Sequence, residues 1–306
     1  MKVFKKHIYL FLSMVISTFL LVGCASSNNI NPSNKNTATN DTVKTTRGKS
    51  EKSPNNILVH YINVGQGDSI LVQVNNKNML IDAGPRDSKD KLISYLKKVN
   101  IKKLDYFIVT HPHEDHIGGA SYIINSFDVV NFYAPKKTHT TKTYRDMINA
   151  LKSKNLKIHV AKEGVSLDLG KDAICEMLSP NRNDYDELNN YSPIIKLKYK
   201  DNKFLFTGDA EALVEKDVLS KKYDVSAEVL KLGHHGSVSS TSEVFLKNVN
   251  PKIAIATCGK DNKYGHPHRE TISKLKKINC KLYRSDLDGN ILVSGDGKNI
   301  KVTTKN

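Results

Sequence analysis

The sequence contains no tryptophan and only four cysteines among its 306 residues. So few cysteines exclude a domain held together by a dense set of disulfides. Glycine and proline, with 17 and 9 residues, are too sparse for a collagen-like or low-complexity chain. Hydrophobic residues make up 39% of the sequence, which is too few for a polytopic membrane protein and too many for a fully disordered chain. The composition therefore predicts a globular protein.

Long apolar runs are missing except near the start, where residues 1–23 predict an export signal. Basic residues come first, and an apolar run then extends from about residue 8 to 22. This run is shorter than the ~20 apolar residues of a comfortable transmembrane helix. It ends in Leu21-Val22-Gly23-Cys24, which resembles the lipobox of bacterial lipoproteins and implies a lipidated Cys24. An uncleaved N-terminal anchor is the alternative, and both predict a chain tethered to the extracellular face of the cell membrane.

Residues 24–54 predict a flexible tether that follows this signal. They consist mostly of Ser, Asn, Thr and Lys, and they cannot bury enough apolar surface to offset chain entropy. The globular domain is therefore expected at residues 55–306. Lipidation of Cys24 leaves three cysteines, so at least one is a free thiol. Cys175 is expected in the core, and a Cys258–Cys280 disulfide would use the other two.

Positive charge is in excess, with 47 lysines and arginines against 31 aspartates and glutamates and a net charge of +16. Most of this excess lies beyond residue 54. Such a domain would suit an anionic partner, such as nucleic acid, teichoic acid or phospholipid headgroups. No run of five or more basic residues occurs, so solvated lysine faces are the alternative explanation. The sequence identifies no protein partner.

Short β-rich runs alternate with helical patterns from residue 55 onward. Strands are expected at residues 57–64, 69–74, 78–82, 104–110, 129–134, 156–160, 173–178, 194–199, 203–207, 228–232, 253–257, 281–284, 290–293 and 300–303. Helices are expected at residues 88–99, 117–126, 142–154, 210–220, 242–250 and 268–277. This alternation predicts sheets covered by helices in a single α/β domain.

The strongest functional signal is the segment Thr110-His111-Pro112-His113-Glu114-Asp115-His116-Ile117-Gly118-Gly119, which follows an apolar strand. Imidazole and carboxylate ligands suit Zn, Mn or Fe. His111 and His113, two residues apart, can bind one metal from an extended turn. Asp115 and His116 begin the next helix and can face a second metal. A solvated His-rich loop is the alternative, but it explains neither the buried strand nor the paired glycines, which let the helix pack closely.

This pattern resembles the H-x-H-x-D-H signature of the metallo-β-lactamase superfamily. The resemblance covers residues 57–304 and implies an αββα sandwich with two metals at one sheet edge. Leu80-Ile81-Asp82-Ala83-Gly84 is similar to the first family motif, whose aspartate orients the histidines. Phe204-Leu205-Phe206-Thr207-Gly208-Asp209 is similar to the fourth motif, which makes Asp209 the carboxylate that bridges both metals. Leu232-Gly233-His234-His235-Gly236-Ser237 is similar to the fifth, which supplies a histidine to the second metal.

Which of His234 and His235 is this ligand stays open. Adjacent residues of a strand point to opposite faces, so only one of the two is expected to coordinate easily. The other would contact substrate or donate a proton. Asp82 would orient a ligand or bind metal itself. Asp68, in a Gly-rich turn, is expected to support the site, and a metal-binding role is its alternative.

Further segments narrow the resemblance to the extracellular hydrolase domain of ComEC-type DNA-uptake proteins, which is proposed to degrade the strand that is not transported. They are Asn63-Val64-Gly65-Gln66-Gly67-Asp68-Ser69, the His-His-Gly-Ser segment, and Tyr264-Gly265-His266-Pro267-His268. Surface phosphorylcholine esterases of the same superfamily are also similar. The resemblance implies that His266 is a catalytic residue that contacts a phosphate. Ser237 and His268 would contact substrate, and a surface turn is the alternative for both histidines.

The third family motif, which usually supplies a lone histidine, has no match here. Only His139 and His159 lie between the second and fourth motifs, and neither has a matching context. The ComEC-type group has Asn and Ser at this place, similar to Asn189-Asn190-Tyr191-Ser192. By this resemblance Asn190 and Ser192 would contact the substrate. The first metal would then keep only two histidines and one aspartate as protein ligands.

Together these motifs predict a membrane-tethered hydrolase with two divalent metal ions, with Zn as the first choice and Mn as the second. The metals would hold a bridging hydroxide that attacks phosphorus in line, and Asp115 would also orient this nucleophile. The expected substrate is a phosphodiester, in DNA or in a wall or lipid polymer. Phosphorylcholine or teichoic acid esterase activity and lactone or β-lactam hydrolysis are the alternatives. A non-catalytic surface binding lipoprotein is the alternative of another class, and the near-complete ligand set argues against it.

Overall fold

The computed structural model describes residues 56–305. The predicted export signal, the lipidated Cys24 and the tether up to residue 54 lie outside the described residues. Within residues 56–305, no helix combines the length and the apolar character that crossing a bilayer requires.

The first sheet has eight strands in the spatial order β15-β14-β1-β2-β3-β4-β5-β6. Their bounds are β1 Ile57–Tyr61, β2 Ile70–Val74, β3 Lys77–Ile81, β4 Lys103–Ile108, β5 Asp128–Ala134, β6 Ile158–Val160, β14 Asn290–Gly295 and β15 Ile300–Lys305. Antiparallel pairs join β1, β2 and β3, and the strands from β3 to β6 run parallel.

The second sheet has seven strands in the order β13-β12-β11-β10-β9-β8-β7. Their bounds are β7 Ser166–Leu167, β8 Ala173–Met177, β9 Ile195–Tyr199, β10 Asn202–Phe206, β11 Val229–Lys231, β12 Ile253–Ala256 and β13 Lys281–Arg284. The strands from β10 to β13 run parallel, as the predicted strand–helix alternation requires.

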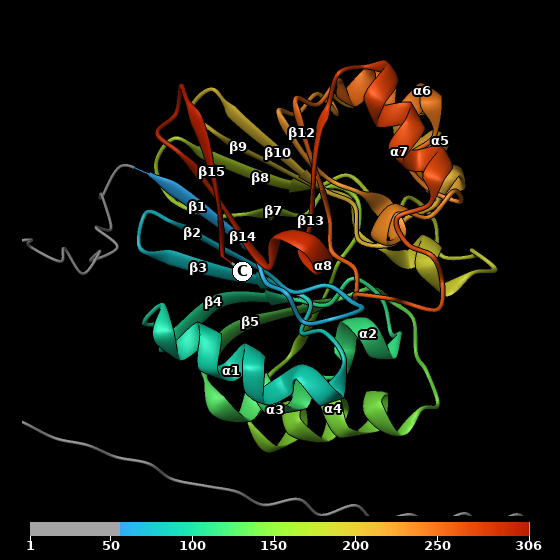
Figure 1. Ribbon diagram of the computed structural model, residues 1–306. Coiled ribbons are helices and arrows are strands. Elements are labelled where there is room, and N and C mark those ends of the chain that lie inside the picture. Colours follow the sequence, from blue (N-terminus) through green and yellow to red (C-terminus); the bar gives the residue numbers. More distant parts are fainter. Residues whose placement is uncertain (1–55, 306) are drawn as a thin grey trace, which may run out of the picture. The chain divides into compact units, whose positions relative to one another are not determined.

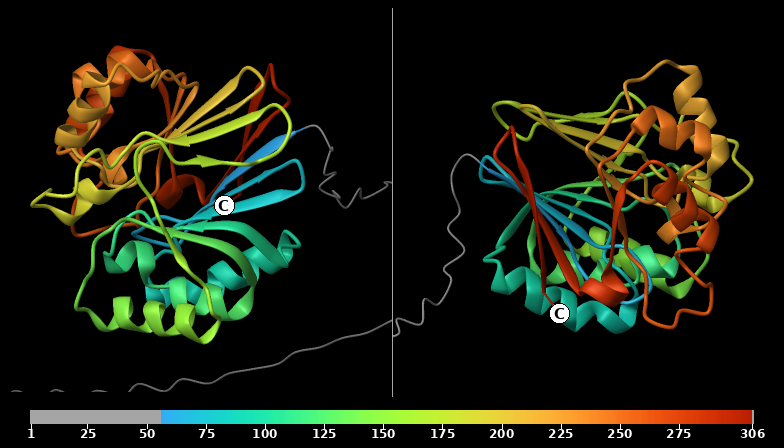
Figure 2. Two further views of the ribbon diagram at one scale, coloured as in Figure 1. Left: turned by 180° about the vertical axis from the view of Figure 1, so that it is seen from behind. Right: turned by 45° about the horizontal axis from the view of Figure 1, so that its top comes forward.

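Helices cover the outer face of each sheet (Figures 1 and 2). Those on the first sheet are α1 Lys89–Lys98, α3 Ala120–Ser126 and α4 Lys142–Ser153, and those on the second are α5 Ala212–Ser220, α6 Glu243–Val249 and α7 Arg269–Lys277. Strand β10 shows why the layers form, because Phe204 and Phe206 enter the core between the sheets while Leu205 packs with the helices. The predicted αββα sandwich is therefore confirmed.

Parallel strands bring the predicted site residues to one edge of the two sheets. In each sheet, the carboxyl ends of parallel strands lie on the same side. Asp82 follows β3 and His111 follows β4, and the register pairs Ile81 with Ile108. Asp209 follows β10 in the second sheet, and the two histidines of the fifth motif follow β11.

The helix predicted at residues 117–126 is wrong in its bounds. Two helices occupy this region, a single turn α2 at Glu114–Ile117 and then α3. At Gly118 an added Cβ would lie 2.2 Å from the Arg86 nitrogen, and at Gly119 it would lie 2.4 Å from the Ala83 oxygen. The paired glycines therefore let this segment pack directly on the loop after β3, as expected, and they interrupt the helix where it does so. A second single turn, α8, spans Ser285–Asp288.

The three cysteines of the described residues are free thiols. The Cys258–Cys280 disulfide is therefore wrong, whereas the core position of Cys175 is confirmed. Burial raises the pKa of each thiol to about 12. A thiol that stays protonated is a poor nucleophile and a poor metal ligand, so the chemistry falls to the histidines and aspartates.

Candidate metal centre

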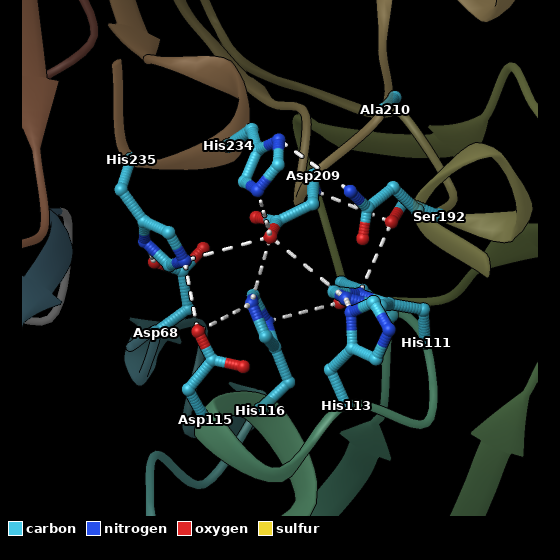
Figure 3. A network of polar contacts seen from close by, with 12 residues as sticks. Asp68, His111, His113, Asp115, His116, Ser192, Asp209, Ala210, His234 and His235 are labelled. Atoms are coloured by element: carbon cyan, nitrogen blue, oxygen red, sulfur yellow. Dashed lines mark hydrogen bonds and ion pairs between the residues drawn. The ribbon is translucent and has the colours of Figure 1, made fainter. Parts of the chain in front are cut away.

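A cluster of histidines and aspartates fills the edge where the strand ends of both sheets meet (Figure 3). The Asp209 carboxylate lies in its middle and is almost completely buried. Its Oδ2 is 3.2–3.8 Å from one ring nitrogen of each of four histidines: His111, His116, His234 and His235. The first two come from the first sheet and the last two from the second, so Asp209 is the shared centre of both halves.

The first half of the site is the pair that follows β4. His111 Nε2 and His113 Nδ1 are 2.9 Å apart, and both point toward the side of Asp209 that faces away from His235 (Figure 3). Ser192 Oγ lies 3.3 Å from His111 Nδ1 and accepts a hydrogen bond from the Asp209 backbone nitrogen at 3.2 Å. Ser192 is completely buried. The substrate contact predicted for Ser192 is therefore wrong, because its buried hydroxyl contacts His111 and Asp209 and is not accessible to a substrate.

The second half of the site gathers three more residues around Asp209. Asp115 Oδ2 lies 3.9 Å from His116 Nε2 and 3.3 Å from His235 Nε2. Ligand atoms of these three residues all fall within 4.8 Å of one another. Together with Asp209 they provide four ligands, and four is the coordination number that Zn commonly has in proteins.

The two adjacent histidines both face the cluster, so the expected strand alternation does not apply. They lie in a tight turn, Gly233–Gly236, where His234 and His235 have φ of 47° and 56°. His235 is buried, and its Nδ1 donates to the Thr257 carbonyl at 2.8 Å, which leaves Nε2 free to bind metal. His234 is partly exposed and lines the pocket over the cluster. This geometry favours His235 as the metal ligand and His234 as a substrate contact.

Asp82 holds His116 rather than facing the cluster. Its Oδ2 accepts from His116 Nδ1 at 2.8 Å and from Thr110 Oγ1 at 2.7 Å. The other oxygen accepts from the Thr110 backbone nitrogen at 2.8 Å. With both oxygens engaged, Asp82 fits the orienting role and not that of a direct ligand.

Asp68 is held by a buried lysine that the motifs did not indicate. Lys231 Nζ lies 2.9 Å from Asp68 Oδ2, and both side chains are at most 1% exposed. The other oxygen is 3.2 Å from His235 Nδ1 and accepts a hydrogen bond from Thr257. Burial opposes the charge of Asp68, but Lys231 and His235 outweigh it and hold the pKa of this carboxyl below its usual range. These contacts favour the supporting role for Asp68.

Several buried atoms of the cluster have no hydrogen-bond partner. They are His116 Nε2, His235 Nε2 and Asp209 Oδ1. Buried polar atoms are nearly always hydrogen-bonded, so three such atoms in one cluster indicate a place for a ligand. Imidazole nitrogens and carboxylate oxygens fit Zn, Mn or Fe. The residues therefore fit a pair of divalent metal ions.

Without metal, we expect the protein to lose stability as the pH rises above about 6.5. Burial by itself lowers the pKa of His116 and His235, but the surrounding aspartates outweigh it and raise both values well above the ordinary one. Stabilisation from a raised histidine pKa is fully present below the unfolded pKa of ~6.5 and is lost as the pH rises through the folded value. Thermal unfolding of chelator-treated protein between about pH 6 and 9 measures this loss.

The same two histidines must be neutral to bind metal, so metal binding is expected to release protons and to tighten as the pH rises. Calorimetric titration with Zn in two buffers of different ionisation enthalpy counts the released protons. A melting temperature that does not change with pH, together with no proton release, would contradict the assigned charges.

The segment 189–192 contributes a different residue from the one predicted. Asn190 Oδ1 accepts from the Glu211 backbone nitrogen at 3.2 Å, and its substrate contact stays a prediction. Asn189 lines the pocket instead, with Nδ2 3.4 Å from His234 Nδ1 and a buried Oδ1 that has no partner. Both asparagines lie in the 3-10 turn Leu188–Tyr191, and the backbone of this turn determines which of the two side chains faces the site.

Among the other predicted residues, only His266 reaches the pocket. Burial, then the neighbouring histidines, lower its pKa to about 4. His268 accepts from the Val238 backbone nitrogen at 3.0 Å and places Nε2 3.0 Å from the Tyr264 carbonyl, so its substrate contact is wrong. Ser237 Oγ accepts from the Ser239 backbone nitrogen at 3.3 Å and is not among the residues that line the pocket, and its substrate contact stays a prediction.

Three pocket residues escaped the motif analysis, namely Gln66, Glu114 and Tyr264. All three lie inside segments that it quoted, but no motif gave them a role. His139 is partly exposed and His159 is exposed, and neither lines this pocket. Neither of them therefore takes the place of the histidine that the third family motif usually supplies.

Comparison with known proteins gives a consistent result. The sequence profile described as the metallo-beta-lactamase superfamily matches residues 62–260. ComE operon protein 3 of Bacillus subtilis is 32% identical over 251 residues, which cover 76% of this chain and 32% of that protein. Recombination protein 2 of Haemophilus influenzae is 28% identical over 241 residues, which cover 77% of this chain and 28% of that protein. The chain thus spans about a third of the length of these curated relatives.

The fold is also found in solved structures. The metallo-beta-lactamase fold protein YhfI from Bacillus subtilis superposes with a TM-score of 0.53 at 13% sequence identity, over 79% of this chain and 100% of that chain. At this identity the likeness concerns the fold alone.

Proposed function

Because the chain belongs to the metallo-beta-lactamase superfamily, whose members include metal-dependent hydrolases, we propose that it hydrolyses phosphodiesters and that DNA is its leading substrate. The observation that carries this proposal is the arrangement of two ligand sets on either side of the buried Asp209 carboxylate. A bound pair of divalent metals would supply Lewis-acid activation of water and of the phosphoryl group.

The residues of this chain then have separate tasks. Asp209 spans both ligand sets, and Asp115 completes the second. Asn189, His234 and His266 line the pocket above them, and the two imidazoles can donate to the oxygens of a phosphodiester. His234 Nδ1 lies 3.5 Å from Glu211 Oε1, which holds the ring with Nε2 directed at the cluster.

Charge and relatedness support DNA as the substrate. The chain has a net charge of +16, and a polyanion is attracted to such a surface. Recombination protein 2 is named for a process that acts on DNA. The N-terminal sequence adds the proposal that the enzyme works at the extracellular face of the membrane, anchored through Cys24. Phosphorylcholine, teichoic acid, lactone and β-lactam substrates remain alternatives, as does a non-catalytic binding lipoprotein.

The direct test uses the purified protein loaded in turn with Zn and with Mn. Hydrolysis of bis(p-nitrophenyl) phosphate and of linear single- and double-stranded DNA is measured, with Asp115→Asn as the control. Metal-dependent hydrolysis of both kinds of substrate that is lost in the variant is the expected result. Hydrolysis of neither by a protein that holds metal would overturn the phosphodiesterase proposal, and a protein that binds no metal would favour a binding lipoprotein.

Substitution of His234 and substitution of His235 are expected to have different effects on metal content and on turnover. His235→Ala should lower the metal content from two equivalents to about one, because it removes a ligand of the second set. His234→Ala should keep both metals and lower kcat by about 10²–10³-fold, the usual effect of losing one donor to the reacting group. Metal analysis together with kinetics separates the two. If His234→Ala loses the metal instead, the assigned roles are reversed.

A further inference from the structure

A second hollow adjoins the pocket over the metal centre. It has a volume of about 650 Å³, and the pocket itself has about 450 Å³. Four residues line both: Gln66, Glu114, Asp115 and Tyr264. The two hollows are therefore neighbours, and the one without His234, His235 and Asp209 in its lining is here called the side groove. Its size lies within the ~300–1,000 Å³ range of small-molecule sites.

The walls of the side groove are held in place by hydrogen bonds between loops. Gln66 Oε1 accepts from the Gly259 backbone nitrogen at 3.1 Å, which ties the loop after β1 to the loop after β12. Asn262 Nδ2 donates to the Gly259 carbonyl at 2.9 Å and to the His266 carbonyl at 2.7 Å. Asn262 Oδ1 accepts from the His266 backbone nitrogen at 2.9 Å. The loop that carries Lys263 and Tyr264 is therefore fixed at both ends.

Two ammonium groups face this groove from different elements. Lys91 comes from α1 and Lys263 from the loop before α7, and both are exposed. Within residues 56–305 neither of them has a carboxylate within ion-pair distance, unlike Lys89, which pairs with Asp90 at 3.2 Å. Three carboxylates, those of Asp87, Glu114 and Asp115, also line the groove. Glu114 Oε1 accepts from the Arg86 backbone nitrogen at 2.8 Å, and Asp115 Oδ2 lies within 3.9 Å of His116 and His235. The two lysines are thus available to an outside anion.

An exposed aromatic ring stands where the side groove meets the pocket. Tyr264 is 52% exposed, and its ring stacks on the His266 ring with centroids 5.6 Å apart and an angle of 19° between the planes. The Lys263 ammonium lies 5.2 Å from the centre of the same ring. An aromatic ring next to a basic group is how proteins hold successive bases of a single strand.

We propose that the side groove binds the nucleotide next to the scissile phosphodiester of a single DNA strand. The base stacks at Tyr264, and Lys91 and Lys263 hold the neighbouring phosphate. This inference rests on the proposed function, since it describes the same substrate beyond the reacting bond. A base-free polymer such as teichoic acid would use the lysines but would leave the aromatic ring without a partner.

The lysines are tested by comparing a long substrate with a short one. Bis(p-nitrophenyl) phosphate has no phosphate besides the scissile one, whereas a single-stranded oligonucleotide has a neighbouring phosphate for the lysines to hold. The Lys91→Ala/Lys263→Ala variant of the metal-loaded protein is expected to lower kcat/KM for the oligonucleotide at least tenfold more than for the small ester. The salt dependence of the oligonucleotide reaction should also weaken, with a slope smaller by about 0.7 for the one phosphate that is no longer neutralised.

The matched control is Lys247→Ala/Lys301→Ala, which removes the same charge from exposed positions on α6 and β15. It should leave the ratio of the two kcat/KM values unchanged. Equal losses of kcat/KM on both substrates, or equal effects in the test and control variants, would overturn the proposal that the side groove binds the neighbouring nucleotide. Failure of the metal-loaded, unaltered protein on both the small ester and the oligonucleotide would instead overturn the proposed phosphodiesterase activity, so the two failures are distinguishable.

The ring is tested with an oligomer that has abasic sugars throughout and the same phosphates. Tyr264→Ala is expected to lower kcat/KM for the normal oligonucleotide by about 5- to 150-fold, the range for one stacked base, and to have a much smaller effect on the abasic oligomer. Tyr264→Phe keeps the ring and should keep the preference for bases. Equal effects of Tyr264→Ala on both oligomers would overturn base stacking and favour a base-free phosphodiester polymer.

Discussion

The Asp209→Asn protein is expected to bind neither metal and to have a turnover more than ~100-fold lower. Mutation of a residue that only hydrogen-bonds a metal ligand already lowers metal affinity or activity 10- to 100-fold, and Asp209 is expected to be a ligand itself. Asparagine has nearly the same shape as aspartate but lacks the charge, so the change isolates electrostatics from packing. In the unaltered protein one Asp209 oxygen lies within 3.8 Å of ring nitrogens from both halves of the site. No other described residue makes contacts of this kind to four histidines. Metal analysis after desalting and hydrolysis of bis(p-nitrophenyl) phosphate measure the two losses.

Glu211→Gln is the matched control for this change. It removes a carboxylate two positions along the chain, and this carboxylate lies beside only one of the four histidines, at 3.5 Å from His234 Nδ1. We expect this variant to keep two equivalents of metal. An Asp209→Asn protein that retained both metals and its turnover would show that Asp209 is not the shared ligand.

Lys231→Met is expected to destabilise the protein by about 3–5 kcal/mol, the cost of breaking a buried ion pair from one side. Methionine fills a similar volume, so the main effect is electrostatic. Asp68 would keep its negative charge at about 1% exposure and would lose its lysine partner, with only His235, 3.2 Å from its other oxygen, left beside it. Urea unfolding at neutral pH measures the free energy of unfolding.

Two further variants decide whether the buried charge is the cause. Adding Asp68→Asn to Lys231→Met removes the unpaired charge and should recover most of the lost stability. Lys196→Met changes another largely buried lysine whose ion-pair partner, Asp224, has a side chain that is 65% exposed, so its ion pair should contribute less than about 1 kcal/mol. A loss below about 1 kcal/mol for Lys231→Met would contradict the importance of the Lys231–Asp68 pair.

The fold and the metal-binding region could be predicted because their signals are local. Apolar strands with helices between them predict parallel sheets, and parallel sheets gather the segments that follow each strand at one edge. The ligand candidates follow β4, β10 and β11, so their positions in the sequence already indicate a common site. The main failure in this region was the treatment of His234 and His235 as strand residues. Their left-handed backbone conformation, which non-glycine residues rarely adopt, turns both rings toward the same cluster.

The parts that could not be predicted depend on contacts between distant segments. Lys231 belongs to an apolar strand, and only its pairing with a carboxylate from another sheet explains a buried ammonium group there. Asn189 and Asn190 differ only in which way a short turn points them. Tyr264 stands at the junction of two hollows whose walls come from loops and helices far apart in the sequence, so its exposure follows from tertiary structure alone.

The division of the ligands between the two sheets also sets the order of assembly. His111, His113, Asp115 and His116 follow a strand of the first sheet, whereas Asp209 and His235 follow strands of the second. Neither half alone holds a complete ligand set, so a metal pair is captured only after the two sheets have packed together. Which metal the protein would carry is then expected to depend on the metal supply of the compartment in which folding finishes, because the ligand types themselves discriminate poorly among Zn, Mn and Fe.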